Sequence, residues 1–132
     1  MSGADGIHVG QADISCAQAR KELGEEAIVG VSVQTVDQAQ AAEAAGASYL
    51  GVGAVFNTAT KQDADLVALS TLRDICDAVQ IPVVAIGGIG EKEVPHLAGT
   101  GISGVAVVSA LFAAPDVEEA ARTLRATVDE CL

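Results

Sequence analysis

Five short apolar runs recur along the chain, and they constrain its fold more than any other feature of the sequence. Most of them lack alternating polar residues, as expected for strands that are covered on both faces in a parallel sheet. We therefore predict strands within residues 6–10, 27–33, 48–56, 81–89 and 103–111.

The stretches between these runs carry helical patterns. Leu69, Leu72, Cys76 and Val79 recur at intervals of three and four residues, and a similar apolar stripe runs through 117–131. Both stripes should cover the sheet.

Polar residues mark where the helices begin. Thr35 with Gln38 and Asp116 with Glu119 each have the spacing of a capping box, and Gly24 stands where the first helix should end. Strand followed by helix, five times over, is a βα repeat. Such a repeat forms either an open doubly wound sheet or part of a (β/α)₈ barrel, and the periodicity does not distinguish them.

The composition limits the class of protein. The 132 residues suit one domain, 1–132. A net charge of −11 and only three aromatic residues disfavour nucleic-acid binding. No apolar run approaches the roughly 20 residues of a membrane span, and residues 1–10 lack the features of a signal peptide. We expect a cytoplasmic protein that binds neither nucleic acid nor membranes.

The histidines and cysteines form no recognisable site in the sequence. His8 lies within the first predicted strand and His96 within a helical stretch, so we interpret both as structural. Cys16, Cys76 and Cys131 form no C-x-x-C motif, and we interpret them as packed thiols.

Polar and small residues gather after the predicted strands, where ligands bind in both candidate architectures. They are Gln11 and Asp13, then Ser32 and Gln34, then Thr58, Thr60 and Lys61, then Gly87 and Gly88, and finally Ser109.

The last two of these loops have the character of a phosphate site. Glycines let the backbone approach a ligand, and a helix N-terminus offers unpaired N–H groups to an anion. Gly88 and the pair Val108–Ser109 would supply them. The alternative is that Gly87 and Gly88 only permit tight turns.

Lys61 and Asp13 can each be interpreted in two ways. Lys61 either pairs with a second anionic group or is merely solvated. Asp13 either caps a helix or, facing phosphates, holds Mg²⁺, which typically takes one or two carboxylates plus phosphate oxygens.

Five motifs resemble the C-terminal part of thiamine phosphate synthase, in the same order and at the same spacing. They are ADGIHVGQAD (4–13), VGVSVQT (29–35), GVGAVFNTATK (51–61), IPVVAIGGI (81–89) and GVAVVSALF (104–112). The resemblance implies the last five βα units of a (β/α)₈ TIM barrel. It also implies a transferase of thiamine biosynthesis that joins hydroxymethylpyrimidine diphosphate to thiazole phosphate and releases diphosphate.

The resemblance assigns roles to individual residues. Asp13 would be a metal-binding residue for magnesium, and Ser32 and Lys61 would contact the pyrimidine diphosphate. Lys61 would be the catalytic residue that stabilises charge on the departing diphosphate. The thiazole phosphate would be bound by Thr58, Ala59, Thr60, Gly88, Val108 and Ser109.

The chain also departs from the family pattern, at Gln34, Ala54, Asn57 and Gly90. The family's first three βα units have no counterpart in it. Five strands cannot close an eight-stranded barrel, and open strand edges invite association. We therefore expect either a truncated product or a partner chain that supplies the missing strands, with self-association or a complementing chain at the open edges. The isolated chain should be unstable or inactive.

Two other functions remain open from the sequence. One is a non-catalytic remnant that retains phosphate binding. The other is a barrel protein similar to thiazole tautomerase, which the absence of an obvious rim His or Cys disfavours.

Overall fold

The computed structural model describes residues 2–57 and 66–132. Within them, the strands are β1 (Gly6–Val9), β2 (Ile28–Val33), β3 (Tyr49–Val52), β4 (Val83–Ile86) and β5 (Gly104–Ala106). The helices are α1 (Cys16–Leu23), α2 (Val36–Ala44), α3 (Leu69–Ala78), α4 (Ser109–Phe112) and α5 (Val117–Cys131), with a 3₁₀ helix η2 (Val94–Leu97). The five predicted strands and both predicted helical stripes are confirmed.

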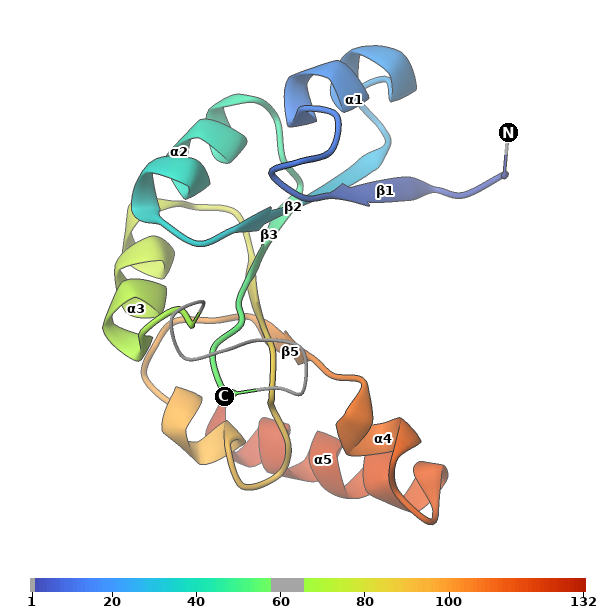
Figure 1. The fold of residues 1–132 in the computed structure, drawn as a ribbon, viewed down its shortest axis with the longest axis vertical. Coiled ribbons are helices and arrows are strands. Elements are labelled where there is room, and N and C mark those ends of the chain that lie inside the picture. The colour runs from blue at the N-terminus through green and yellow to red at the C-terminus, as the bar shows by residue number, and fades with distance from the viewer. Residues whose placement is uncertain (1, 58–65) are drawn as a thin grey trace.

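The order of the strands decides between the two candidate architectures. All neighbours are parallel and the order is β1-β2-β3-β4-β5. Right-handed crossovers between successive strands place every helix on the same face of the sheet. Figure 1 shows the sheet as an arc with α1, α2 and α3 around its outside. A doubly wound sheet would reverse its strand order and carry helices on both faces. The fold is therefore part of a TIM barrel.

The hydrophobic core lies between the outer face of the sheet and the helices. Val9, Val31, Leu50 and Val83 are aligned across four strands and are all buried. Leu72 of α3 is fully buried beneath the same face. Burial of such side chains contributes on the order of 1.5–3 kcal/mol each, so this layer holds the helices to the sheet.

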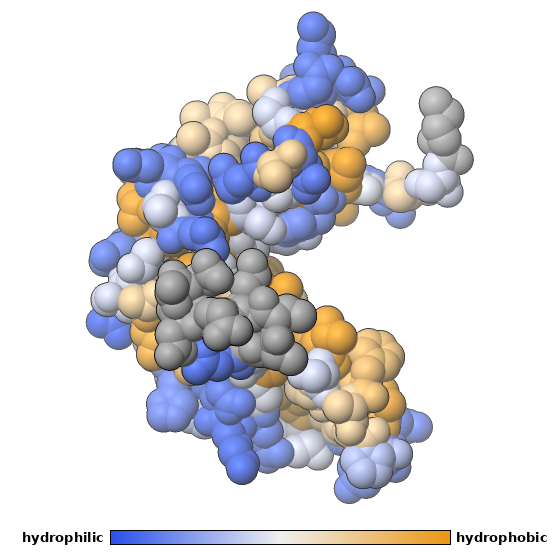
Figure 2. Space-filling view, viewed as in Figure 1, coloured by the Kyte–Doolittle hydropathy of each residue, from blue (hydrophilic) through white to orange (hydrophobic). Residues whose placement is uncertain are grey.

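The inner face of the sheet is uncovered in the described chain. Ile28 and Ile86 have 53% and 43% of their surface exposed, although both lie within strands. Figure 2 shows that this side of the molecule is open and that apolar surface flanks the opening. The strands at the two ends of the described sheet, β1 and β5, each pair on one side only.

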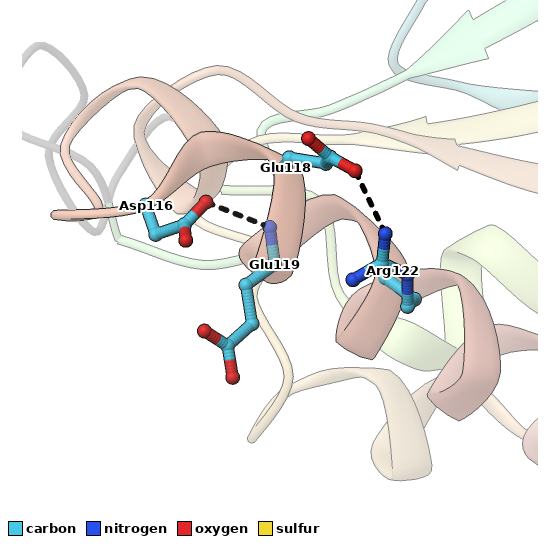
Figure 3. A network of polar contacts seen from close by, with 4 residues as sticks. All are labelled: Asp116, Glu118, Glu119 and Arg122. Atoms are coloured by element: carbon cyan, nitrogen blue, oxygen red, sulfur yellow. Dashed lines mark hydrogen bonds and ion pairs between the residues drawn. The ribbon is translucent and has the colours of Figure 1, made fainter.

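The predicted capping boxes form only in part. Thr35 Oγ1 accepts a hydrogen bond from the Gln38 N–H at 3.1 Å, but Gln38 Oε1 accepts from the Gln34 N–H instead of returning to Thr35. Asp116 Oδ1 accepts from the Glu119 N–H at 3.0 Å. Figure 3 shows the Glu119 carboxylate turned away from Asp116. Each cap therefore satisfies one N–H group of its helix through the N-cap side chain.

The connection between β4 and β5 departs from a regular βα repeat. Its helical stretch is the single 3₁₀ turn η2, where an α-helix was expected. Gly87, Gly88 and Gly90 precede this turn, and Gly99 and Gly101 follow it. Glycine in a helix interior costs about 1 kcal/mol relative to alanine, which leaves too few good helix-forming positions for a longer helix.

The cysteines are free: Cys16 is buried, and Cys76 and Cys131 are half-buried. This agrees with their interpretation as packed thiols. Within the described ranges, no helix is long and apolar enough to cross a membrane.

Candidate functional site

A cavity of about 660 Å³ opens at the C-terminal ends of the strands. Four of the predicted site residues line it: Ser32 from β2, Gly88 after β4, and Val108 and Ser109 after β5. These residues lie far apart in the sequence, and the parallel strands bring them together because their carboxyl ends share one edge of the sheet. Gln11 and Gln34 also line the cavity, as their positions after the first two strands predict.

Ser32 lies near the end of β2 and is half-buried. Its Oγ is 2.7 Å from Nε2 of His8, and its carbonyl oxygen accepts a hydrogen bond from Gln11 Nε2 at 2.8 Å. The hydroxyl and the carbonyl oxygen of Ser32 are therefore both held by residues of the preceding βα unit.

Gly87 and Gly88 have backbone φ angles of +104° and +64°, which favour glycine. A Cβ atom on Gly88 would lie 2.5 Å from the carbonyl oxygen of Asn57, and Phe56 N–H donates to the Gly87 carbonyl at 3.0 Å. The tight turn and its approach to the preceding loop require these glycines whether or not a ligand binds. The turn explanation therefore accounts for the glycines, and the phosphate site needs separate support.

That support comes from backbone N–H groups beside the cavity. The N–H groups of Gly88 and Ser109, which both line the cavity, donate to no other residue of the described chain. Ser109 begins α4 and its side chain is exposed. Unpaired N–H groups and a hydroxyl at one cavity wall are suitable partners for an anionic oxygen.

Asp13 does not line this cavity but lines a neighbouring pocket, and Gln11 lines both. Its Oδ2 accepts a hydrogen bond from the Gly10 N–H at 2.7 Å and closes the turn after β1. The side chain that caps α1 belongs to Ser15, which accepts from the Gln18 N–H, so the helix-cap reading of Asp13 is wrong. Across residues 2–57 and 66–132, no group of three or more His, Cys, Asp or Glu residues is placed to hold a metal ion.

Thr58, Ala59, Thr60 and Lys61 lie outside the described residues, so their predicted roles stay predictions. The described residues on both sides of them are anchored near the cavity. Asn57 lies against Gly88, and the Val67 N–H donates to the carbonyl oxygen of Ala54 at 2.7 Å. Ala54 and Gly88 both line the cavity.

His8 and Tyr49 belong to the surroundings of the site, although sequence reasoning did not select them for it. His8 Nδ1 is 2.9 Å from the Tyr49 hydroxyl, and the ring centroids are 5.6 Å apart. The sequence signal that could have identified His8 was a histidine inside an apolar parallel strand. His8 lies two residues after Gly6 and therefore on the same face of the sheet. Its partners come from β2 and β3, which no local pattern identifies.

The fold and this cavity together define part of a TIM-barrel protein whose site lies at the C-terminal ends of its strands and carries a few polar side chains among mostly apolar ones. A sequence model described as thiamine monophosphate synthase matches residues 1–111. The chain therefore belongs to the thiamine monophosphate synthase family.

Individual relatives agree with this assignment. A thiamine-phosphate synthase of Clostridium acetobutylicum is 45% identical over 121 residues, which cover 92% of this chain and 57% of the relative. Thiamine-phosphate synthase 2 of Streptococcus pneumoniae is 50% identical over 87% of this chain and 55% of the relative. The chain thus spans somewhat more than half the length of these curated relatives.

Solved structures show the same fold. Thiamine phosphate pyrophosphorylase from Pyrococcus furiosus superposes with a TM-score of 0.87 and 43% identity, over 98% of this chain and 61% of that chain. KGPDC from Streptococcus mutans is only 18% identical and has a TM-score of 0.73 over 98% of this chain, so it shows the fold alone.

Proposed function

We propose that this chain forms the C-terminal five βα units of a thiamine phosphate synthase. The reaction joins hydroxymethylpyrimidine diphosphate to thiazole phosphate and releases diphosphate. The observation that carries the proposal is the cavity that unites Ser32, Gly88, Val108 and Ser109 in a chain of this family. The comparisons favour neither the remnant nor the tautomerase alternative.

The phosphate of the thiazole substrate is bound at the wall formed by the loops after β4 and β5. There the N–H groups of Gly88 and Ser109, which donate to no other described residue, present partial positive charge to the phosphate, and the Ser109 hydroxyl donates to it. Thr58, Ala59 and Thr60 are the other proposed ligands of this phosphate.

The diphosphate of the other substrate is bound by Ser32 and Lys61. As diphosphate leaves, negative charge builds on its oxygens and positive charge on the pyrimidine methylene, which the thiazole nitrogen then attacks. A lysine ammonium and a hydroxyl donor stabilise the departing oxygens. The protein contributes positioning and charge stabilisation, so the reaction needs no protein nucleophile.

Asp13 is the proposed magnesium ligand, and one of its two carboxylate oxygens is available to an ion. One carboxylate oxygen is bound to the Gly10 N–H, and the other has no hydrogen-bond partner among the described residues. Mg²⁺ commonly uses one or two carboxylates and takes its remaining ligands from phosphate oxygens and water. When bound there, the ion would supply positive charge to the diphosphate.

We further propose that three additional βα units close the barrel against this chain. Grooves run along both exposed strands: about 620 Å³ beside β1, with Ile7 and Leu23, and about 430 Å³ beside β5, with Val105 and Val128. Open strand edges and exposed apolar side chains of this kind are suited to a further strand.

The length of the solved relative supports the number three. Five units correspond to 61% of the Pyrococcus furiosus chain. The remaining 39%, at the same length per unit, has room for about three more, which makes the eight strands of a TIM barrel. A second copy of this chain would instead bring the total to about ten strands. Such a barrel would be wider than an eight-stranded barrel, in which side chains just fill the interior.

Ligand binding tests the proposed function. Thiazole phosphate should bind the 132-residue chain in calorimetry and raise its melting temperature, because a ligand of the folded state stabilises it by mass action. Ser109→Asp should abolish both effects, since it places a carboxylate at the proposed phosphate position. Ser103→Asp is the matched control, because Ser103 precedes β5 and lies at its opposite end.

The control should bind as the unmodified chain does. A folded chain that binds neither thiazole phosphate nor inorganic phosphate would contradict the proposed site. Equal loss of binding in both Asp variants would show that added negative charge, and not its position at the cavity, is responsible.

A further inference from the structure

We propose that His8 is a positioning residue that orients the Ser32 hydroxyl toward the cavity, and that Tyr49 in turn holds His8. The inference rests on the proposed contact between Ser32 and the departing diphosphate. It goes beyond that contact by assigning a role to two residues that do not line the cavity.

The three side chains form a connected chain of polar contacts across three strands. Tyr49 Oη lies 2.9 Å from His8 Nδ1, and His8 Nε2 lies 2.7 Å from Ser32 Oγ. The strand register produces this arrangement. His8 aligns with Gly30, and Gly30 aligns with Tyr49, so the two ring-bearing residues stand on either side of a glycine on the inner face.

Two glycines make room for the rings. A Cβ atom on Gly30 would collide with the Tyr49 ring, and one on Gly51 would lie 3.2 Å from His8 Cε1. Both rings therefore lie close over the inner surface of the sheet. This packing limits the orientations of His8 and keeps its Nε2 directed at Ser32.

The direction of the hydrogen bonds determines what Ser32 can do. A neutral histidine carries one donor and one acceptor nitrogen, whereas each hydroxyl can donate or accept. When Tyr49 donates to Nδ1, the His8 Nε2–H donates to Ser32 Oγ. The Ser32 proton is then free to donate to an anionic oxygen in the cavity.

The opposite arrangement removes that ability. If Nδ1 carries the proton and donates to Tyr49, then Nε2 accepts a hydrogen bond from the Ser32 hydroxyl. Ser32 would then present only lone pairs to the ligand, and these repel a diphosphate oxygen. The Tyr49 hydroxyl can serve either tautomer, and the proposed role of Tyr49 is to donate to Nδ1 and so hold His8 in the productive one.

Ser32 is the only member of the three that lines the cavity in the described chain. His8 therefore acts on a ligand through Ser32, and not by direct contact. This separates a positioning role from a binding role and gives the proposal a measurable consequence.

The test measures binding of inorganic diphosphate to the full 132-residue chain by calorimetry. His8→Leu should weaken binding about five- to tenfold, the equivalent of one ordinary hydrogen bond, and Ser32→Ala should do the same. In the Ser32→Ala background, His8→Leu should have no further effect. His8→Gln should restore most of the affinity, because its amide N–H can replace the Nε2 donor. His96→Leu, on η2, is the control and should bind normally.

Nitrogen chemical shifts of His8 give a second measurement that needs no ligand. The proposal expects the proton on Nε2, and Tyr49→Phe should reduce the population of that tautomer. A dominant Nδ1–H tautomer, or losses that add fully in the double variant, would overturn the positioning role of His8. Normal binding by Ser32→Ala would instead overturn the diphosphate contact of Ser32, so the two failures are distinguished.

Discussion

Gly88 and Phe56 approach so closely that a Cβ atom placed on Gly88 would lie 2.9 Å from the Cβ atom of Phe56. This contact joins the loop after β4 to the loop after β3, and Gly88 lines the cavity between the strand ends. The shape of the cavity therefore depends on the packing of two loops that are 32 residues apart in the sequence.

Gly88→Ala should lower the free energy of unfolding by about 1–3 kcal/mol, because alanine is strained at φ +64° and its methyl group would press on the neighbouring loop. Urea denaturation measures the change. Gly104→Ala is the control, since a Cβ atom there meets nothing within 4 Å, and it should change stability by no more than about 0.5 kcal/mol. Equal effects of the two substitutions would contradict the close approach at Gly88.

Arg20→Ala should destabilise the fold more than Lys21→Ala. The Arg20 guanidinium donates hydrogen bonds to the carbonyl oxygens of Gly24, Glu25, Ala27 and Gly46 and to the Ser48 hydroxyl. It thereby ties the end of α1 to the starts of β2 and β3. Loss of hydrogen bonds to a charged group typically costs about 1.5–3 kcal/mol.

Lys21 has no hydrogen bond or ion pair with another described residue, which makes it a matched control at the next position. Arg20→Lys should recover only part of the loss, because an ammonium cannot reach all five acceptors. If chemical denaturation shows that Arg20→Ala and Lys21→Ala are equally stable, the hydrogen bonds of Arg20 make no net contribution to the free energy of unfolding.

The raised pKa values of two cysteines predict a loss of stability at alkaline pH. Burial raises the pKa of the Cys16 thiol above its ordinary value of 9.0, against a smaller lowering by Arg20. Burial also raises the pKa of Cys76, and Asp77 adds to that effect. The unfolded chain therefore ionises these thiols first as the pH rises. Their contribution is fully present below pH 9.0 and is lost as the pH rises through the raised values.

The measurement is the free energy of unfolding between pH 7 and pH 11 for the unmodified chain and for a variant with Cys16→Ala and Cys76→Ala. The unmodified chain should lose more stability than the variant across the alkaline range. Parallel curves for the two proteins would show that thiol ionisation is not coupled to folding.

Barrel closure predicts complementation. The part of the Pyrococcus furiosus protein that this chain does not cover, co-expressed with residues 1–132, should form a one-to-one complex in size-exclusion chromatography with light scattering. The complex should make thiamine phosphate, and Lys61→Ala should abolish that activity. The isolated chain should not turn over at a useful rate, because removed charge contacts typically cost about 10²–10³ each. Steady turnover by residues 1–132 alone, abolished by Lys61→Ala, would contradict this.

The sequence by itself determined most of the secondary structure and the edge of the sheet on which the site lies. The strands within 27–33 and 81–89 and the stripe from Leu69 to Val79 were predictable because burial imposes a local period on each element. The same reasoning placed Ser32 and Ser109 at strand ends, since parallel strands share a carboxyl edge. It predicted an α-helix between β4 and β5, where the structure has the 3₁₀ turn η2.

The periodicity left a barrel and an open sheet undecided, the family resemblance predicted the barrel, and the strand order confirmed it. Only the tertiary structure joined His8 to Ser32 and Tyr49. The reason is that strand order and register are set by pairing between segments distant in the chain. A shift of one residue in register would turn His8 to the opposite face of the sheet. Local periodicity specifies which residues form a strand, whereas the neighbours of each side chain depend on how the strands assemble.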